Sequence, residues 1–302
     1  MEDRFALLID ADNVSAKYIK PILDELSKYG NVTYKRIYGD WTKSNSASWK
    51  EELLQNSITP IQQFSYTQGK NSTDSAMIID AMDILYAKDV DGFCIVSSDS
   101  DFTRLVSRLR ESGKMVIGMG ENKTPEPFRK ACDKFTILEN LLVENDPGTA
   151  QEKEPEDGLS REAIEDEIIR IVLENQDSNK ATGLGEVGSR LVSLYPDFDV
   201  RSYGYSSLSK FFEEFDRIQL VKHGHVAWVT LKENRARKED VDQFVRNLVK
   251  GAGEAGMDLG AIGNRVYDKY KDFKLNDYGY SQFKKYVKLE QDGKRWKAHY
   301  KK

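Results

Sequence analysis

The segment Phe5-Ala-Leu-Leu-Ile-Asp10-Ala-Asp12-Asn13 joins a short apolar run to a group of polar side chains. Five consecutive apolar residues are typical of a strand that is buried on both faces, as in a parallel sheet. In open parallel sheets, binding and catalytic sites form at the carboxyl ends of the strands. This segment therefore predicts a buried parallel strand with a candidate functional site directly after it.

The same arrangement recurs through residues 4–143, where short apolar stretches alternate with longer amphipathic ones. The predicted strands are Phe5–Ile9, Val32–Tyr38, Pro60–Phe64, Gly92–Val96 and Met115–Gly118, and the predicted helices lie near 16–29, 46–56, 73–87 and 102–112. Repeated strand-helix units predict a mostly parallel sheet covered by helices on both faces. The predicted fold class for this part is α/β, doubly wound.

An acidic stretch with Pro and Gly, residues 144–159, predicts a linker. Beyond it the chain repeats itself: from Leu184 and Leu259 onward, twelve of 28 positions are identical at a constant offset of 75 residues. Each copy has the pattern of three helices and a short hairpin, which is typical of a small winged-helix (α+β) domain. We therefore predict four parts: 1–143, the linker 144–159, repeat 1 at 160–233 and repeat 2 at 234–302.

Composition excludes several classes of protein. No apolar run approaches the roughly 18 residues of a membrane helix, so no membrane segment is expected. The start Met1-Glu-Asp-Arg-Phe5 is acidic, unlike a signal peptide. Only two cysteines occur, without a CxxC pair, which argues against a disulfide scaffold or a cysteine zinc site. A cytoplasmic protein with two free thiols is expected.

The net charge of −5 conceals a basic carboxyl-terminal repeat. Repeat 2 carries 17 Lys and Arg against 10 Asp and Glu, whereas repeat 1 carries 9 against 13. Basic residues interleaved with aromatic ones suit phosphate contact and base stacking, although a solvated helix face is the alternative. The candidate nucleic-acid-binding residues of repeat 2 are Tyr280, Lys284, Lys285, Lys288, Arg295 and Trp296. Repeat 1 is expected to bind nucleic acid poorly and to dock a protein or the first domain.

Carboxylates gather where the predicted strands end. Asp10 and Asp12 follow the first strand, Asp99 and Asp101 follow Gly92–Val96, and Asp74 opens a helix. Any one of them is explained by helix capping, but together they exceed what caps require. Like charges in close proximity repel, and a hard cation such as Mg²⁺ or Mn²⁺ relieves that repulsion.

Asp80 is expected to have a structural role. It lies six residues after Asp74, about 240° around a helix, so these two carboxylates do not face the same metal.

Three segments resemble the signature motifs of NYN domains, a group of PIN-like metal-dependent nucleases. They are Ala6-Leu-Leu-Ile-Asp10-Ala-Asp-Asn13, Gly69-Lys-Asn-Ser-Thr-Asp74 and Val96-Ser-Ser-Asp99-Ser-Asp101-Phe-Thr103. The resemblance implies a PIN-like fold and a metal site lined by Asp10, Asn13, Asp74, Asp99 and Asp101. Lys70, on a glycine turn, is a candidate phosphate contact, with an ordinary surface lysine as the alternative.

The two repeats share Tyr-Gly-Tyr-Ser and resemble OST-HTH (LOTUS) domains, which implies binding of RNA or of a protein partner. We therefore expect a divalent-metal-dependent ribonuclease that hydrolyses RNA phosphodiester bonds, with carboxyl-terminal modules that position RNA.

Two other functions remain open. The first segment also fits the start of haloacid-dehalogenase-type phosphatases, with Asp10 as nucleophile and Asp12 as general acid. That interpretation needs a lysine before the second acidic pair, and no lysine stands out there. A catalytically silent NYN scaffold that binds RNA or protein is the second alternative. The preference for RNA or DNA and the choice of endo or exo action are also open.

Overall fold

The computed structural model describes residues 2–42, 47–64, 72–87, 89–142, 159–223, 226–232, 235–252, 257–270, 275, 290–292 and 295–298. The amino-terminal part is built on a six-stranded sheet of order β3-β2-β1-β4-β5-β6, in which every neighbouring pair is parallel. Its strands are β1 (Arg4–Asp10), β2 (Asn31–Gly39), β3 (Thr59–Gln62), β4 (Gly92–Val96), β5 (Met115–Gly120) and β6 (Lys134–Ile137). The predicted α/β class is confirmed.

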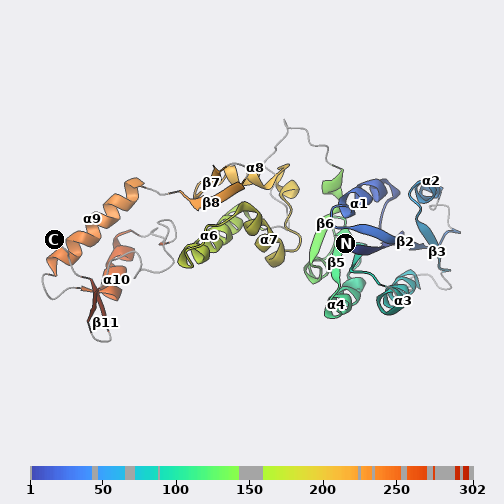
Figure 1. Cartoon of the computed structure of the whole chain (residues 1–302), viewed down its shortest axis with the longest axis horizontal. Coiled ribbons are helices and arrows are strands. Elements are labelled where there is room, and N and C mark those ends of the chain that lie inside the picture. The colour runs from blue at the N-terminus through green and yellow to red at the C-terminus, as the bar shows by residue number, and fades with distance from the viewer. Residues whose placement is uncertain are drawn as a thin grey trace. The chain divides into compact units, whose positions relative to one another are not determined.

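Helices cover both faces of this sheet, as Figure 1 shows. One face carries α1 (Ile19–Leu26) and α2 (Ala47–Gln55), and the other carries α3 (Ser72–Ala87), α4 (Thr103–Glu111) and α5 (Glu126–Ala131). Strand β1 divides its side chains between the two cores: Phe5, Leu7 and Ile9 pack on the α1 side, and Ala6 and Leu8 on the α3 side. This alternation is why the central strand is apolar without interruption.

The order of the strands reverses beside β1. The chain runs from β1 outward to β2 and β3, and then returns to place β4 on the other side of β1. A reversal of this kind leaves a crevice at the carboxyl ends of the two central strands. Asp10 is the last residue of β1, so it lies at that point.

The last strand predicted from the sequence ends at Gly118, and neither α5 nor β6 was predicted. Strand β6 has only four residues, Lys134-Phe-Thr-Ile137, and pairs with β5 at the edge of the sheet. A four-residue segment with two polar members has too little periodicity to predict a strand.

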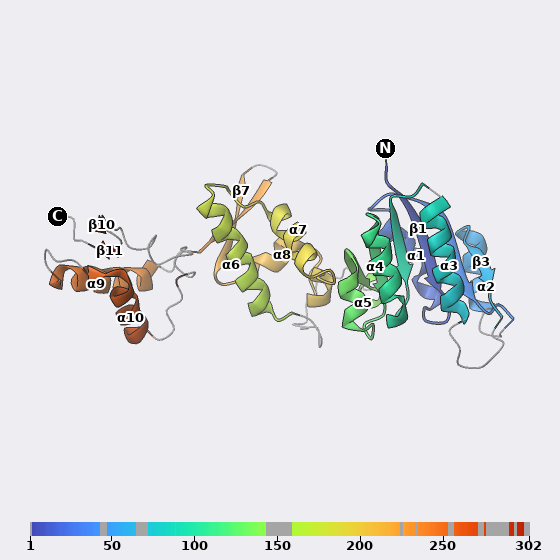
Figure 2. The same ribbon diagram turned by 90° about the horizontal axis from the view of Figure 1, so that it is seen from below.

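The carboxyl-terminal elements agree with the predicted repeats where they are described. The first copy contains α6 (Arg161–Asp177), α7 (Leu184–Leu194), α8 (Leu208–Glu213) and the antiparallel hairpin β7 (Ile218–His223) with β8 (Val226–Leu231), which Figure 2 shows from below. The second contains α9 (Arg235–Gly251), β9 (Met257–Asp258), α10 (Leu259–Lys269), β10 (Glu290–Asp292) and β11 (Arg295–Ala298). Residues 281–288, where the repeat pattern places the third helix of this copy, lie outside the described residues.

The chain divides into two compact units. One consists of Met1–Gln151 together with Arg190–Gly204, and the other of Glu152–Ser189 together with Tyr205–Lys302. The segment Arg190–Gly204 therefore belongs to the unit that contains the six-stranded sheet. No helix among the described residues has the length and apolar character needed to cross a membrane.

Candidate metal centre

Asp10 anchors the site at the carboxyl end of β1. Strands β1 and β4 are adjacent, and Ile9 pairs with Val96, so Asp10 and Ser97 follow side by side. The Asp10 side chain is fully buried, and its Oδ2 accepts hydrogen bonds from Ser97 Oγ at 2.8 Å and from Asn13 Nδ2 at 2.7 Å. Its Oδ1 accepts the backbone N–H of Asp12 at 3.0 Å. Burial raises the pKa of Asp10, although these hydrogen bonds oppose the rise.

A group of three carboxylates lies at the same edge of the sheet. Asp74, Asp99 and Asp101 each offer an oxygen, and these three oxygens lie within 4.8 Å of one another. Asp74 stands in the first turn of α3, while the other two follow β4. Two ligands on opposite sides of a cation, each about 2.4 Å from it, are themselves about 4.8 Å apart. The spacing and the all-oxygen donor set therefore fit a hard divalent cation.

The local backbone after β4 explains why Asp99 and Asp101 approach each other. Asp99 is the N-cap of the short helix η3 (Ser100–Phe102), and its Oδ1 accepts the N–H of Asp101 at 2.9 Å. Ser97 Oγ accepts the N–H of Asp99 at 3.1 Å while it donates to Asp10. Asp99 thus serves as a helix cap and also belongs to the carboxylate group.

The electrostatics of Asp74 connect the two strand ends. Burial raises the pKa of Asp74 to about 6, and repulsion by Asp10, Asp99, Asp101 and Asp12 adds to the rise. Asp10 is the strongest of these charged neighbours, so the buried anchor and the three-carboxylate group belong to one field of negative charge. A bound cation would favour the ionised form of Asp74.

Helix α3 is held beside β1 by a side-chain contact that the sequence analysis did not identify. The hydroxyl of Thr73, which is buried, donates to Asp12 Oδ2 at 3.1 Å. This bond fixes the first turn of α3, which carries Asp74, against the loop after β1. Asp12 is exposed and acts here as an acceptor for the helix start.

The candidate residues thus have different places in the structure. Asp74, Asp99 and Asp101 form the carboxylate group, Asp10 is fully buried and raises the pKa of Asp74 through its charge, and Asn13 donates to Asp10. The amide of Asn13, which was expected to line the metal site, donates to the buried carboxylate, and its role at the metal site stays a prediction. Ser97 and Thr73 had been quoted only as parts of motifs. Their positions in the sequence could have indicated these roles, because the Ser97 hydroxyl comes directly after a predicted strand and the Thr73 hydroxyl stands at the start of a predicted helix.

Asp80 has the structural role that was predicted for it. Its two carboxylate oxygens accept hydrogen bonds from the guanidinium of Arg36 and the hydroxyl of Tyr38, both in β2. These two hydrogen bonds join α3 to the sheet. Cys94, which was expected in the core, is fully buried in β4.

The predicted nucleic-acid contacts cannot be placed as side chains. Lys70, Tyr280, Lys284, Lys285 and Lys288 lie outside the described residues, and Arg295 and Trp296 are described only as backbone of β11. These seven residues stay predictions.

Comparison with known proteins finds two families of domain in this chain. Residues 1–151 include a match to the NYN domain model at 4–139, and the OST-HTH/LOTUS domain model matches twice, at 162–230 and 236–290. Uncharacterized protein MJ0482 of Methanocaldococcus jannaschii is 29% identical over 123 residues, which are 39% of this chain and 48% of that protein. The chain therefore spans about half the length of this curated relative.

Among solved structures, a protein of unknown function from Vibrio parahaemolyticus, VPA0982, aligns with a TM-score of 0.37 and 20% identity over 44% of this chain and 91% of its own. The motifs, the parallel sheet and the family matches together identify the chain as an NYN domain protein with two OST-HTH/LOTUS domains after it.

Proposed function

We propose that this protein is a divalent-metal-dependent ribonuclease that cleaves phosphodiester bonds at the edge of its parallel sheet. The NYN family belongs to the PIN-like nuclease superfamily, and together with the OST-HTH/LOTUS domains it marks a nuclease-like RNA-binding protein. The observation that carries the finer proposal is the group Asp74, Asp99 and Asp101, with oxygens within 4.8 Å of one another. Mg²⁺ and Mn²⁺ are the cations that best suit such oxygen ligands.

In this proposal the three carboxylates hold the cation, directly or through water. A bound divalent cation supplies a water of lowered pKa and neutralises charge that develops on the phosphate. Asp10 and Ser97 keep the ends of β1 and β4 in register, and Asp99 remains fixed by its cap bond. Asp99 and Asp101 are therefore positioned by the backbone that follows β4, and Asp74 by the first turn of α3.

The geometry of Asp10 bears on the phosphatase alternative. A nucleophilic carboxylate needs an accessible oxygen, yet Asp10 is fully buried and both of its oxygens accept hydrogen bonds. Asp12, the general acid of that mechanism, accepts a hydrogen bond from Thr73. These contacts favour the nuclease function over a covalent aspartyl-phosphate mechanism.

A cleavage assay distinguishes the proposed nuclease from a catalytically silent scaffold. Full-length protein is incubated with single-stranded and duplex RNA and DNA in Mg²⁺, Mn²⁺ or EDTA, in parallel with Asp99→Asn. The proposal requires cleavage of RNA with metal, none with EDTA, and loss of cleavage in the variant, because metal ligands act as a unit. The matched control is Asp83→Asn, an exposed carboxylate of α3.

Two results would contradict the proposal. Cleavage by Asp99→Asn at the wild-type rate would remove the carboxylate group from the mechanism. RNA binding without cleavage in any metal would assign the chain to the scaffold class.

A further inference from the structure

The segment Pro196–Tyr203 lies inside the first OST-HTH match, yet it belongs to the compact unit of the NYN sheet. The backbone carbonyl of Pro196 accepts the N–H of Phe135 at 2.7 Å. Phe135 lies in β6, and in the part of the chain that the structure describes no strand pairs with the outer backbone groups of this edge strand. An unpaired edge is open to pairing with other chains, so this bond protects part of the sheet.

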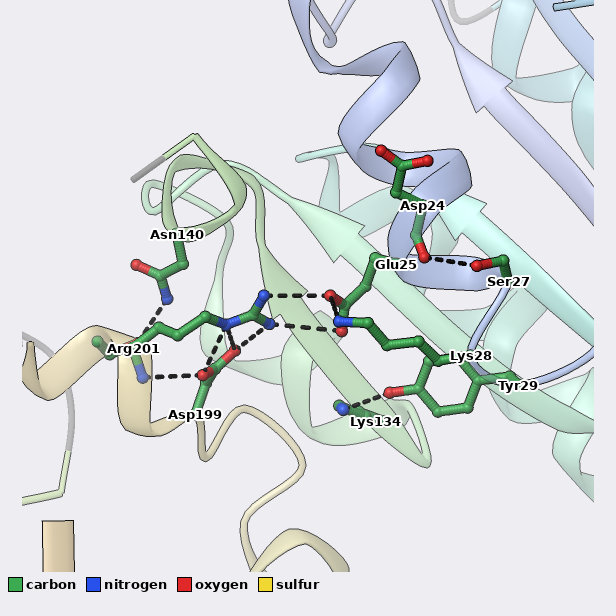
Figure 3. Close-up of polar contacts among 10 residues, drawn as sticks. Asp24, Glu25, Ser27, Lys28, Tyr29, Lys134, Asn140, Asp199 and Arg201 are labelled. Carbon is green, nitrogen blue, oxygen red and sulfur yellow. Dashed lines mark hydrogen bonds and ion pairs between the residues drawn. The ribbon is translucent and has the colours of Figure 1, made fainter. Parts of the chain in front are cut away.

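Arg201 supplies the main charged contact, which Figure 3 shows between Asp199 and Glu25. Its Nη1 lies 3.1 Å from Glu25 Oε2, and its Nη2 contacts Asp199 Oδ2 at 2.6 Å. Glu25 belongs to α1, and its side chain is only 4% exposed. A planar guanidinium that bridges two carboxylates is a geometrically specific contact.

The charges at this point are matched. Burial acts to raise the pKa of Glu25, but hydrogen bonds from Lys28 and Arg201 outweigh it and the net shift is downward. Burial likewise acts to lower the pKa of Arg201, and its bonds to Asp199 and Glu25 raise it overall. Glu25 is thus a buried anion held in its charged form by two cations, and removal of one of them is expected to be costly.

Two further contacts join the same segment to other elements of the NYN domain. Asn140 Nδ2 donates to Ser202 Oγ at 2.7 Å, and Arg129 Nη1 lies 3.7 Å from Asp197 Oδ2. Asn140 belongs to the short helix η4 (Leu138–Leu141), and Arg129 to α5. The segment therefore contacts α1, α5, β6 and η4.

The second repeat has different residues at most of the positions that make these contacts. At the offset of 75 residues, the ring positions Phe198 and Tyr203 are kept as Phe273 and Tyr278. The contact positions change: Pro196, Asp199, Arg201 and Ser202 correspond to Lys271, Lys274, Asn276 and Asp277. Lys274 reverses a charge, and Asn276 cannot form a salt bridge with Glu25. The two ring positions and Asp197, which is kept as Asp272, are shared by the two copies, whereas the other four contact residues are found in the first copy alone.

We propose that Pro196–Tyr203 is a dedicated docking surface by which the first OST-HTH repeat is anchored to the NYN domain of its own chain. This surface of the first repeat is consequently closed to RNA and to other proteins. The proposal does not depend on the nuclease activity, because none of its contacts involves the carboxylate group.

Cross-linking tests the contact in the full-length chain. Cysteines replace Asn140 and Ser202 in one variant, and Asn140 and Asp277, the matching position of repeat 2, in the control. A short homobifunctional maleimide is added, and intramolecular cross-linking is followed by denaturing gel mobility. The native thiols Cys94 and Cys132 are buried, and burial raises the pKa of the Cys132 thiol to about 12, so both react slowly.

We expect the first pair to cross-link about tenfold faster than the control pair, because its reacting groups are held in contact. Equal rates for the two pairs would overturn the proposal.

Hydrogen exchange gives a second measurement that does not need the cysteine variants. Arg201→Asn introduces the residue of the second repeat, and Arg217→Asn is the control, because Arg217 also bridges two carboxylates and both arginine side chains are 25% exposed. We expect exchange of the Phe135 amide to accelerate about fivefold or more in Arg201→Asn and to stay unchanged in Arg217→Asn. Unchanged exchange in Arg201→Asn, or equal acceleration in both, would refute the anchor.

Discussion

The substitution Asp74→Asn tests the charge balance of the carboxylate group most directly. Asp74 has an ordinary pKa of 3.8 that burial and four neighbouring carboxylates raise to about 6. Taken whole, such a rise corresponds to about 3 kcal/mol of unfavourable free energy for the ionised form. The side chain is partly exposed, so water and salt screen the repulsion, and we discount the figure to about 1 kcal/mol.

Without metal, Asp74→Asn therefore stabilises the folded protein. In EDTA at pH 7.5 we expect the Tm of the NYN unfolding transition to rise by about 2–4 °C, which is the shift for about 1 kcal/mol in a domain of this size. Because the folded pKa is raised, wild-type Asp74 binds its proton more tightly when folded. The gain of the variant is full above the folded pKa of about 6 and disappears as the pH falls toward 3.8.

Saturating Mn²⁺ should reverse the order of the two proteins. A cation at 100 times its Kd stabilises the folded state by about 2.7 kcal/mol, so the wild-type Tm rises while the variant, which lacks a ligand, gains much less. Differential scanning calorimetry with EDTA and with Mn²⁺ measures both effects. Asp83→Asn is the control, since this exposed residue lies nine positions later on α3, about 180° around the helix. An Asp74→Asn protein with wild-type Tm in EDTA and a wild-type response to Mn²⁺ would refute the reasoning.

Two further predictions concern the NYN domain, and one concerns the basic charge of repeat 2. Asp10→Asn should abolish RNA cleavage while Asp12→Asn retains most of it, and turnover of p-nitrophenyl phosphate that is lost in Asp12→Asn would instead support the phosphatase. Deletion of residues 234–302 should raise the KM for long RNA about tenfold or more and leave kcat on a short oligonucleotide nearly unchanged, as steady-state kinetics at about 50 and 200 mM salt would show. Asp80→Asn should lower stability by about 2–3 kcal/mol in urea unfolding without removing metal binding, because it breaks a partly buried pair with Arg36.

Much of the site could be predicted because its residues follow strands. Asp10, Asp99 and Asp101 come after apolar runs, and parallel strands end at one edge. The predicted elements agree with the structure for the same reason, since alternating strand and helix periods are local features of the chain. What could not be predicted is that Asp10 is fully buried and hydrogen-bonded to Ser97, because that depends on β4 lying next to β1.

The roles of single polar residues were harder to predict from the sequence. Asn13 holds a buried carboxylate, and Thr73 fixes the start of α3, although both stood in recognised motifs. A motif specifies which residue types occur together but not which atom accepts from which. Strand β6 was missed because its four residues become a strand only by pairing with β5.

The sequence by itself determined the α/β class, the repeat of 75 residues, the basic second copy and the carboxylates at the strand ends. Each of these features depends on composition or on the spacing of residues along the chain. Both can be found from the sequence without knowledge of which segments meet in the fold. Only the tertiary structure decided which carboxylates meet and that Arg201 pairs with Glu25 across 176 residues. Such contacts depend on the order of the strands in the sheet and on which charged groups become buried together. The periodicity of nearby residues specifies neither of these.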